Sequence, residues 1–220
     1  MTTTALPRTA LHLTAMAVPL AGWTLHTTLL RRRLVEAQRD PLTGTWRREA
    51  FTERAQRLLE RSLEQTVLIL ADADHFKQLN DTYGHAAGDT ALAAIGARLT
   101  EWAGPRGVTG RLGGDEFATL APIEPRHYTL RLAHLSRLMA RPVPYEDGLL
   151  PLRVSLGAAN PDDLAVHDLP TLMRAADAAM YEGKHGGVII QARPGHAQEP
   201  TVNGRRVGRP GTAVRTTPRP

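Results

Sequence analysis

Hydrophobic positions follow two different periods between residues 47 and 191. Helical spacing of apolar residues predicts helices over 47–64, 90–102, 126–139 and 169–182. Short unbroken apolar runs predict strands over 67–73, 108–112, 117–121, 152–158 and 188–191. Two of these strands flank Gly113-Gly114 and are expected to form a tight hairpin. The pattern therefore predicts an α+β fold, an α/β sandwich with a central mixed, mainly antiparallel sheet.

The N-terminal segment has a different character. Residues 10–30 contain no Asp, Glu, Lys or Arg, and Arg31-Arg32-Arg33 follows at once. Such a stretch is long enough to span a bilayer, with the arginines on the cytoplasmic side. Polar residues, Pro19 and Gly22 interrupt the apolar run. Three interpretations stay open: a membrane anchor, an amphipathic or dimerising helix, and a signal peptide.

The net charge is confined to the C-terminal end of the chain. The formal charge is +5, and residues 193–220 carry six arginines against a single glutamate, which accounts for all of it. This segment is rich in proline and lacks apolar periodicity, so we expect it to be disordered. The predicted organisation is an N-terminal helix and linker (1–38), a folded domain (39–192) and a basic tail (193–220). No nucleic-acid partner is expected, because the rest of the chain is formally neutral.

Acidic residues gather where two predicted strands end. Asp72 and Asp74 close the strand over 67–73 and project to the same side, and Asp115-Glu116 occupy the tip of the hairpin. Since the chain has no cysteine, any metal here must use oxygen or imidazole ligands. If the hairpin lies beside the first strand, three or four carboxylates converge, and hard cations such as Mg²⁺ would relieve their repulsion. Taken separately, each motif reads more readily as a turn or a helix cap.

Together with the sequence between them, these motifs resemble the GGDEF family of diguanylate cyclases. The resemblance rests on VLILADADHFKQLNDTYGHAAGDTAL (67–92) and GRLGGDEFATL (110–120), and extends to DPLTG (40–44), SLGAA (155–159) and ADAAMYEGK (176–184). It covers residues 39–191. It implies a palm-like, ferredoxin-like nucleotidyl cyclase core, and an enzyme that joins two GTP molecules into cyclic di-GMP and releases pyrophosphate. The cyclase domain would lie in the cytoplasm, at the inner face of the membrane if residues 10–30 are an anchor.

The resemblance also implies roles for individual residues. Asp72, the backbone carbonyl of Ala73 and Asp115 would hold two Mg²⁺ or Mn²⁺ ions in each half-site, with Glu116 as a further ligand. Asp115 would be the catalytic carboxylate that helps to deprotonate the attacking 3′-hydroxyl. Guanine would be recognised by Asn80 and Asp89. The triphosphate would be held by Phe76, Lys77 and Lys184. Because each domain binds one GTP, catalysis would need a homodimer.

Three departures from the family pattern stand out. The positions of the usual Arg-x-x-Asp inhibitory site hold Gly104 and Gly107, so product inhibition through that site is not expected. The usual Lys-x-x-Gly-Arg-Asn near the end becomes a sequence in which Val188 replaces the arginine. The common Gly-Leu-x-Asn-Arg becomes Gly-Thr-Trp-Arg-Arg at 44–48, which alters the entry of a helix more than the chemistry. The loss of the arginine keeps an alternative open, a degenerate module that binds GTP and acts in regulation.

Overall fold

The computed structural model describes residues 8–62, 65–166, 168–184, 186 and 188–198. The chain divides into two units, Met1–Arg39 and Asp40–Pro220. The first unit contains helix α1 (Arg8–Ala37), which includes the whole charge-free stretch 10–30. Among the helices within the described ranges, none is both long and apolar enough to cross a membrane.

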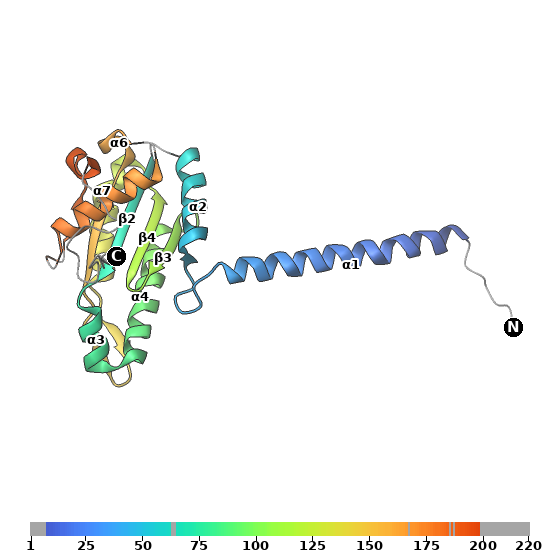
Figure 1. Cartoon of the computed structure of the whole chain (residues 1–220), viewed down its shortest axis with the longest axis horizontal. Helices are drawn as coiled ribbons and strands as arrows, with labels where there is room; N and C mark the ends of the chain where they lie inside the picture. The colour runs from blue at the N-terminus through green and yellow to red at the C-terminus, as the bar shows by residue number, and fades with distance from the viewer. Residues whose placement is uncertain (1–7, 63–64, 167, 185, 187, 199–220) are drawn as a thin grey trace, which may run out of the picture. The chain divides into compact units, whose positions relative to one another are not determined.

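A six-stranded sheet forms the centre of the second unit (Figure 1). Its strand order is β1-β3-β4-β2-β7-β8. The outer pairs β1–β3 and β7–β8 are parallel, and the inner pairs are antiparallel. The predicted mixed, mainly antiparallel sheet is therefore confirmed. The strands are β1 (Trp46–Arg47), β2 (Thr66–Ala73), β3 (Val108–Gly113), β4 (Glu116–Pro122), β7 (Val154–Ala159) and β8 (Ile190–Gln191).

Helices cover both faces of this sheet. The four predicted helices correspond to α2 (Arg48–Arg61), α4 (His85–Ala103), α5 (Tyr128–Met139) and α7 (Leu169–Glu182), and the short helix η2 (Pro125–His127) precedes α5. The pattern did not predict α3 (Phe76–Tyr83), α6 (Pro161–Leu164) or the separate hairpin of β5 (Val143–Tyr145) and β6 (Gly148–Leu150). It also predicted disorder from residue 193 onwards, whereas Pro194–Gln198 form the helix η3 against α7. Residues 199–220 lie outside the described residues.

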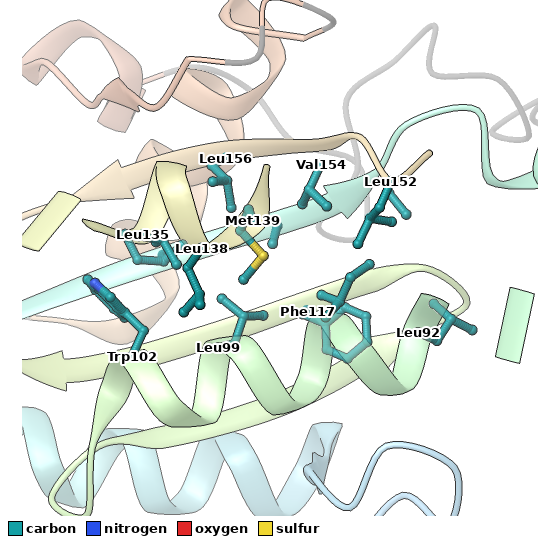
Figure 2. Close-up of a cluster of buried hydrophobic side chains, with 14 of the residues drawn as sticks. Leu92, Leu99, Trp102, Phe117, Leu135, Leu138, Met139, Leu152, Val154 and Leu156 are labelled. Atoms are coloured by element: carbon teal, nitrogen blue, oxygen red, sulfur yellow. The ribbon is translucent and has the colours of Figure 1, made fainter. Parts of the chain in front are cut away.

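The central strand β2 explains how the two layers are built. All eight of its residues are buried, as expected for a strand covered on both faces. Val67, Ile69 and Ala71 face the cluster formed with α4 and α5, whereas Leu68 and Leu70 face the cluster formed with α2 and α7. Figure 2 shows the first cluster, in which side chains from α4, α5 and β7 gather in one layer together with Phe117 of β4.

Two local features fix the packing of these layers. The indole Nε1 of the fully buried Trp102 donates a hydrogen bond to the Arg131 carbonyl at 2.8 Å, so the ring is buried without an unpaired donor. On the other face, α7 lies very close to β7 at Gly157. A Cβ atom there would lie 2.1 Å from the Ala176 carbonyl oxygen. Glycine is therefore required for α7 to reach the sheet, and Lys184, a predicted site residue, follows the C-terminal end of α7.

Candidate active site

The site begins where β2 ends. Asp72 is paired with Glu116 on β4 and with Ser155 on β7. Directly paired residues of antiparallel strands point to the same face of the sheet, so the Asp72 and Glu116 carboxylates are neighbours. Asp72 is buried, and the chain leaves the end of β2 to enter α3 (Figure 1). The hairpin therefore lies beside the first strand, as the sequence analysis required.

The β3–β4 hairpin places Asp115 at its tip. Gly114 has a φ of 55°, a conformation that favours glycine, and the register shifts between Arg111 and Gly113. The Arg111 guanidinium donates to the Gly114 carbonyl from Nε at 2.9 Å and from Nη2 at 2.6 Å. It also bonds the Asp40 carboxylate at 3.2 Å. The turn is thus held in one shape by a side chain from β3.

Asp115 lies in a partly buried, acidic environment. The backbone N–H of Ala73 donates to the Asp115 carbonyl at 3.3 Å, which holds the tip of the hairpin against the end of β2. Burial raises the pKa of Asp115, and the neighbouring Asp72 and Glu116 carboxylates raise it further. The Lys184 ammonium acts in the opposite direction. A carboxyl group in this position is easily neutralised unless a cation stabilises its charge.

Lys184 provides a positive charge next to this cluster. It follows α7, and its Nζ lies 3.0 Å from Oδ1 of Asp72. The resemblance implied that Lys184 holds triphosphate, whereas the structure places its ammonium on the carboxylate implied to bind metal. Sequence analysis could not predict this contact, because 112 residues separate the two.

The donor set fits a hard divalent cation. Asp72, Asp115, Glu116 and the Ala73 carbonyl offer only oxygen ligands, which Mg²⁺ and Mn²⁺ prefer. Within the described part of the chain, no three His, Cys, Asp or Glu side chains are already arranged to hold a metal ion. Oδ1 of the buried Asp74 accepts a hydrogen bond from the Ser155 hydroxyl at 2.7 Å, and Ser155 is the strand partner of Asp72.

The residues implied to read guanine lie on α3 and α4. The Asn80 side chain packs against Gly88, where an added Cβ would lie 1.9 Å from Asn80 Oδ1. This oxygen is buried and accepts no hydrogen bond from any described residue. Burying an amide oxygen without a hydrogen-bond donor costs free energy. An N–H group of a bound ligand would supply the missing donor. Asp89 is exposed and follows Gly88 directly, so the structure brings Asn80 and Asp89 to neighbouring positions.

The residues implied to hold phosphate begin α3. Phe76 and Lys77 occupy its first turn, and Lys77 is exposed. The preceding residue, His75, has a φ of 55°, a left-handed conformation that non-glycine residues adopt rarely. A cavity of about 460 Å³ lies on a different face of α3, along Gln78, Leu79 and Thr82. None of the predicted substrate residues lines it.

The comparisons with known proteins give the family. The model of the "Diguanylate cyclase, GGDEF domain" family matches residues 37–188, more than half of the chain. The chain belongs to the GGDEF family. It is therefore a domain of cyclic di-GMP signalling. The cyclases of this family generally use a divalent metal.

Individual relatives agree with this assignment. The chain is 45% identical over 179 residues to the uncharacterized 19.3 kDa protein in the repSA 5′ region of Streptomyces ambofaciens, a match covering 81% of this chain and 93% of that protein. It is 33% identical over 184 residues to the diguanylate cyclase DgcN of Escherichia coli K12, covering 81% of this chain but only 45% of that protein. The solved GGDEF domain of PA1120 (TpbB or YfiN) from Pseudomonas aeruginosa has a TM-score of 0.64 and 31% identity, and the match covers 72% of this chain and 96% of that domain.

Proposed function

We propose that this GGDEF domain is an active diguanylate cyclase. It joins two GTP molecules into cyclic di-GMP and releases two pyrophosphates. The observation that carries the proposal is the cluster of Asp72, Asp115 and Glu116, in which a buried carboxylate and its neighbours are held together at the end of β2. Neighbouring carboxylates repel one another, and Lys184 supplies a single positive charge beside three of them, so the cluster favours the binding of further cations.

The metal ligands in this proposal are Asp72, the Ala73 carbonyl and Asp115, with Glu116 as a further ligand. Two Mg²⁺ ions bound by these oxygens would stabilise the charge that develops on the phosphoryl oxygens and lower the pKa of the attacking hydroxyl. The Asp115 carboxylate accepts the proton of the 3′-hydroxyl. The O3′ atom then forms a bond to the α-phosphorus of the other GTP, and the bond from that phosphorus to pyrophosphate breaks.

The remaining site residues bind the nucleotide. Asp89 accepts from the N1–H and the N2 amine of guanine, and Asn80 completes the recognition through its amide. The backbone at Phe76 and the Lys77 and Lys184 ammonium groups hold the triphosphate. Lys184 is suited to this task because its ammonium already lies beside the metal-binding carboxylates.

Helix α1 supplies the dimerisation that the reaction needs. Apolar or small residues recur on it at alternating steps of three and four, at positions 13, 16, 20, 23, 27, 30, 34 and 37. Such a seam is the sequence feature of a coiled coil. Among the large seam residues whose side chains the structure describes, Trp23 is 69% exposed, Leu30 is 49% exposed and Leu34 is 58% exposed. Pairing two copies of this helix would raise the effective concentration of one GTP-loaded domain near the other.

One observation favours a second candidate, a module that binds GTP without turnover. Val188, at the position of the family arginine, is 61% exposed and cannot contact phosphate through charge. The test is to incubate the purified chain with GTP and Mg²⁺, and to identify the products by chromatography. Cyclic di-GMP and pyrophosphate in a ratio of one to two support the cyclase. Saturable GTP binding with neither product supports the second candidate.

A further inference from the structure

The chain after β8 folds back onto the end of α7. Ala192 is buried, and its N–H donates to the Ala158 carbonyl at 2.7 Å. The helix η3 follows, and the Nη1 atom of Arg174 on α7 donates to the Ala197 carbonyl at 3.1 Å. His196 is the one residue of η3 that is buried. This short segment is therefore attached to α7 by specific contacts.

Glu182, the last residue of α7, is the centre of the attachment. Its two carboxylate oxygens accept hydrogen bonds from Nη2 of Arg193 at 2.8 and 2.6 Å. One of them also accepts from Nε2 of His196 at 2.9 Å. These donors lower the pKa of Glu182, and the Arg193 hydrogen bond is the largest cause. We name the three side chains, Glu182, Arg193 and His196, the C-terminal clamp.

Both ring nitrogens of the clamp imidazole have a hydrogen-bond partner. The backbone N–H of Arg193 donates to Nδ1 of His196 at 3.1 Å, so Nδ1 must carry a lone pair. The proton is then on Nε2, which donates it to Glu182. Both ring nitrogens are satisfied, which is the condition for burying a histidine without cost. The ring is thus held in one orientation between the segment and α7.

Glu182, the clamp residue on α7, lies two residues before Lys184. Gly183, between them, packs so closely on β8 that a Cβ there would lie 2.5 Å from Cγ1 of Ile190. The Lys184 N–H donates to the Tyr181 carbonyl at 3.2 Å, and its Nζ reaches Asp72. The position of the Lys184 ammonium therefore depends on where α7 ends.

We propose that the C-terminal clamp positions Lys184 for the nucleotide site, with His196 and Glu182 as positioning residues and Lys184 as the group that contacts phosphate. The inference rests on the proposed function. It gives a reason for the clamp in this chain: Val188 replaces the family arginine, so binding of the triphosphate relies more heavily on Lys184. Fixing Lys184 before the nucleotide arrives reduces the entropy lost on binding.

The test measures binding of 3′-deoxy-GTP with Mg²⁺ by calorimetry, using the full chain. This nucleotide lacks the attacking hydroxyl, so binding is read without turnover. His196→Ala is expected to weaken binding roughly fivefold, the effect of losing a hydrogen bond. His196→Gln retains a donor toward Glu182 and should restore most of the affinity. Glu182→Gln is a second variant that keeps the size of the side chain. The control is His127→Ala, whose ring is half exposed and contacts Glu124.

A double-mutant cycle separates positioning from general stabilisation. If the clamp acts through Lys184, His196→Ala has no further effect on binding in the Lys184→Ala background. Equal weakening in both backgrounds would overturn the proposal, as would unchanged binding by His196→Ala and Glu182→Gln. If the wild-type chain binds no 3′-deoxy-GTP at all, the proposed function itself fails and the clamp proposal fails with it.

Discussion

At the scale of single residues, Asp115 combines its proposed catalytic role with a cost in stability. Its pKa is raised because the group is partly buried and lies beside Asp72 and Glu116. Since the folded state holds the proton more tightly than the unfolded state, ionisation of Asp115 at neutral pH opposes folding. That cost is present above its folded pKa and is relieved as the pH falls.

Replacing Asp115 tests both its proposed catalytic role and its cost in stability. Asp115→Asn should reduce cyclic di-GMP formation by about 100-fold or more, because the carboxylate that accepts the proton is lost. In the absence of metal, the same variant should unfold at a higher temperature than wild type at pH 7, and the difference should shrink at pH 4. Product formation and thermal unfolding measure the two effects. Asp147→Asn, in the exposed β5–β6 turn, is the control. Full activity of the Asp115 variant would contradict the assignment.

Gly88 allows a second test at this scale. In Gly88→Ala, the new methyl group would overlap Oδ1 of Asn80 and force the amide away from its position. The helix itself tolerates alanine well, so the effect should fall on the nucleotide. We expect the KM for GTP to rise about fivefold with a smaller change in kcat, as expected when a hydrogen bond to substrate is lost. Ala86→Gly, an exposed position on the same helix, is a control for backbone effects. An unchanged KM would show that Asn80 does not contribute to guanine recognition.

At the scale of elements, the hydrophobic pattern predicted those segments that bury a continuous face. The run at β2 and the periodic face of α7 were recognised because packing alone determines them. Helix α3 was missed because only Leu79 of its eight residues is buried. The hydrogen bonds from Lys184 to Asp72 and from His196 to Glu182 could not be predicted, since they depend on where α7 meets the sheet. Family motifs supplied residue identities, and the structure supplied their neighbours.

The close contact between α7 and β7 at Gly157 sets how near α7 lies to the sheet. In Gly157→Ala, the added methyl group would overlap backbone atoms of α7 at Ala176 and Met180, which cannot move without shifting the helix. The free energy of unfolding should fall by about 2–3 kcal/mol, measured by urea denaturation. Gly195→Ala is the matched control, because a Cβ there has no neighbour within 4 Å. Equal stability of the two variants would show that α7 can separate from β7 at little cost.

At the scale of the whole molecule, the proposed function requires two chains, because each domain would supply half of the site. The seam on α1 is the part of the chain best suited to bring two copies together. Leu34→Glu places a charge in that seam, whereas Leu25→Glu makes the same change at an exposed position outside it. Sedimentation should show the first variant as a monomer at concentrations where the second is a dimer. The specific activity of Leu34→Glu should be at least about tenfold lower than that of Leu25→Glu, because the effective concentration of one domain near the other is lost. Equal sedimentation of both variants would exclude this seam as the dimer interface.

The most direct test of the account is the rate of cyclic di-GMP formation as a function of chain concentration, with saturating GTP and Mg²⁺. A site shared by two chains predicts that the rate rises with the square of the concentration below the dimerisation constant and becomes linear above it. A rate that stays linear down to concentrations at which sedimentation shows only monomer would contradict the shared site. The absence of product from a chain that sedimentation shows to be dimeric would contradict the cyclase itself.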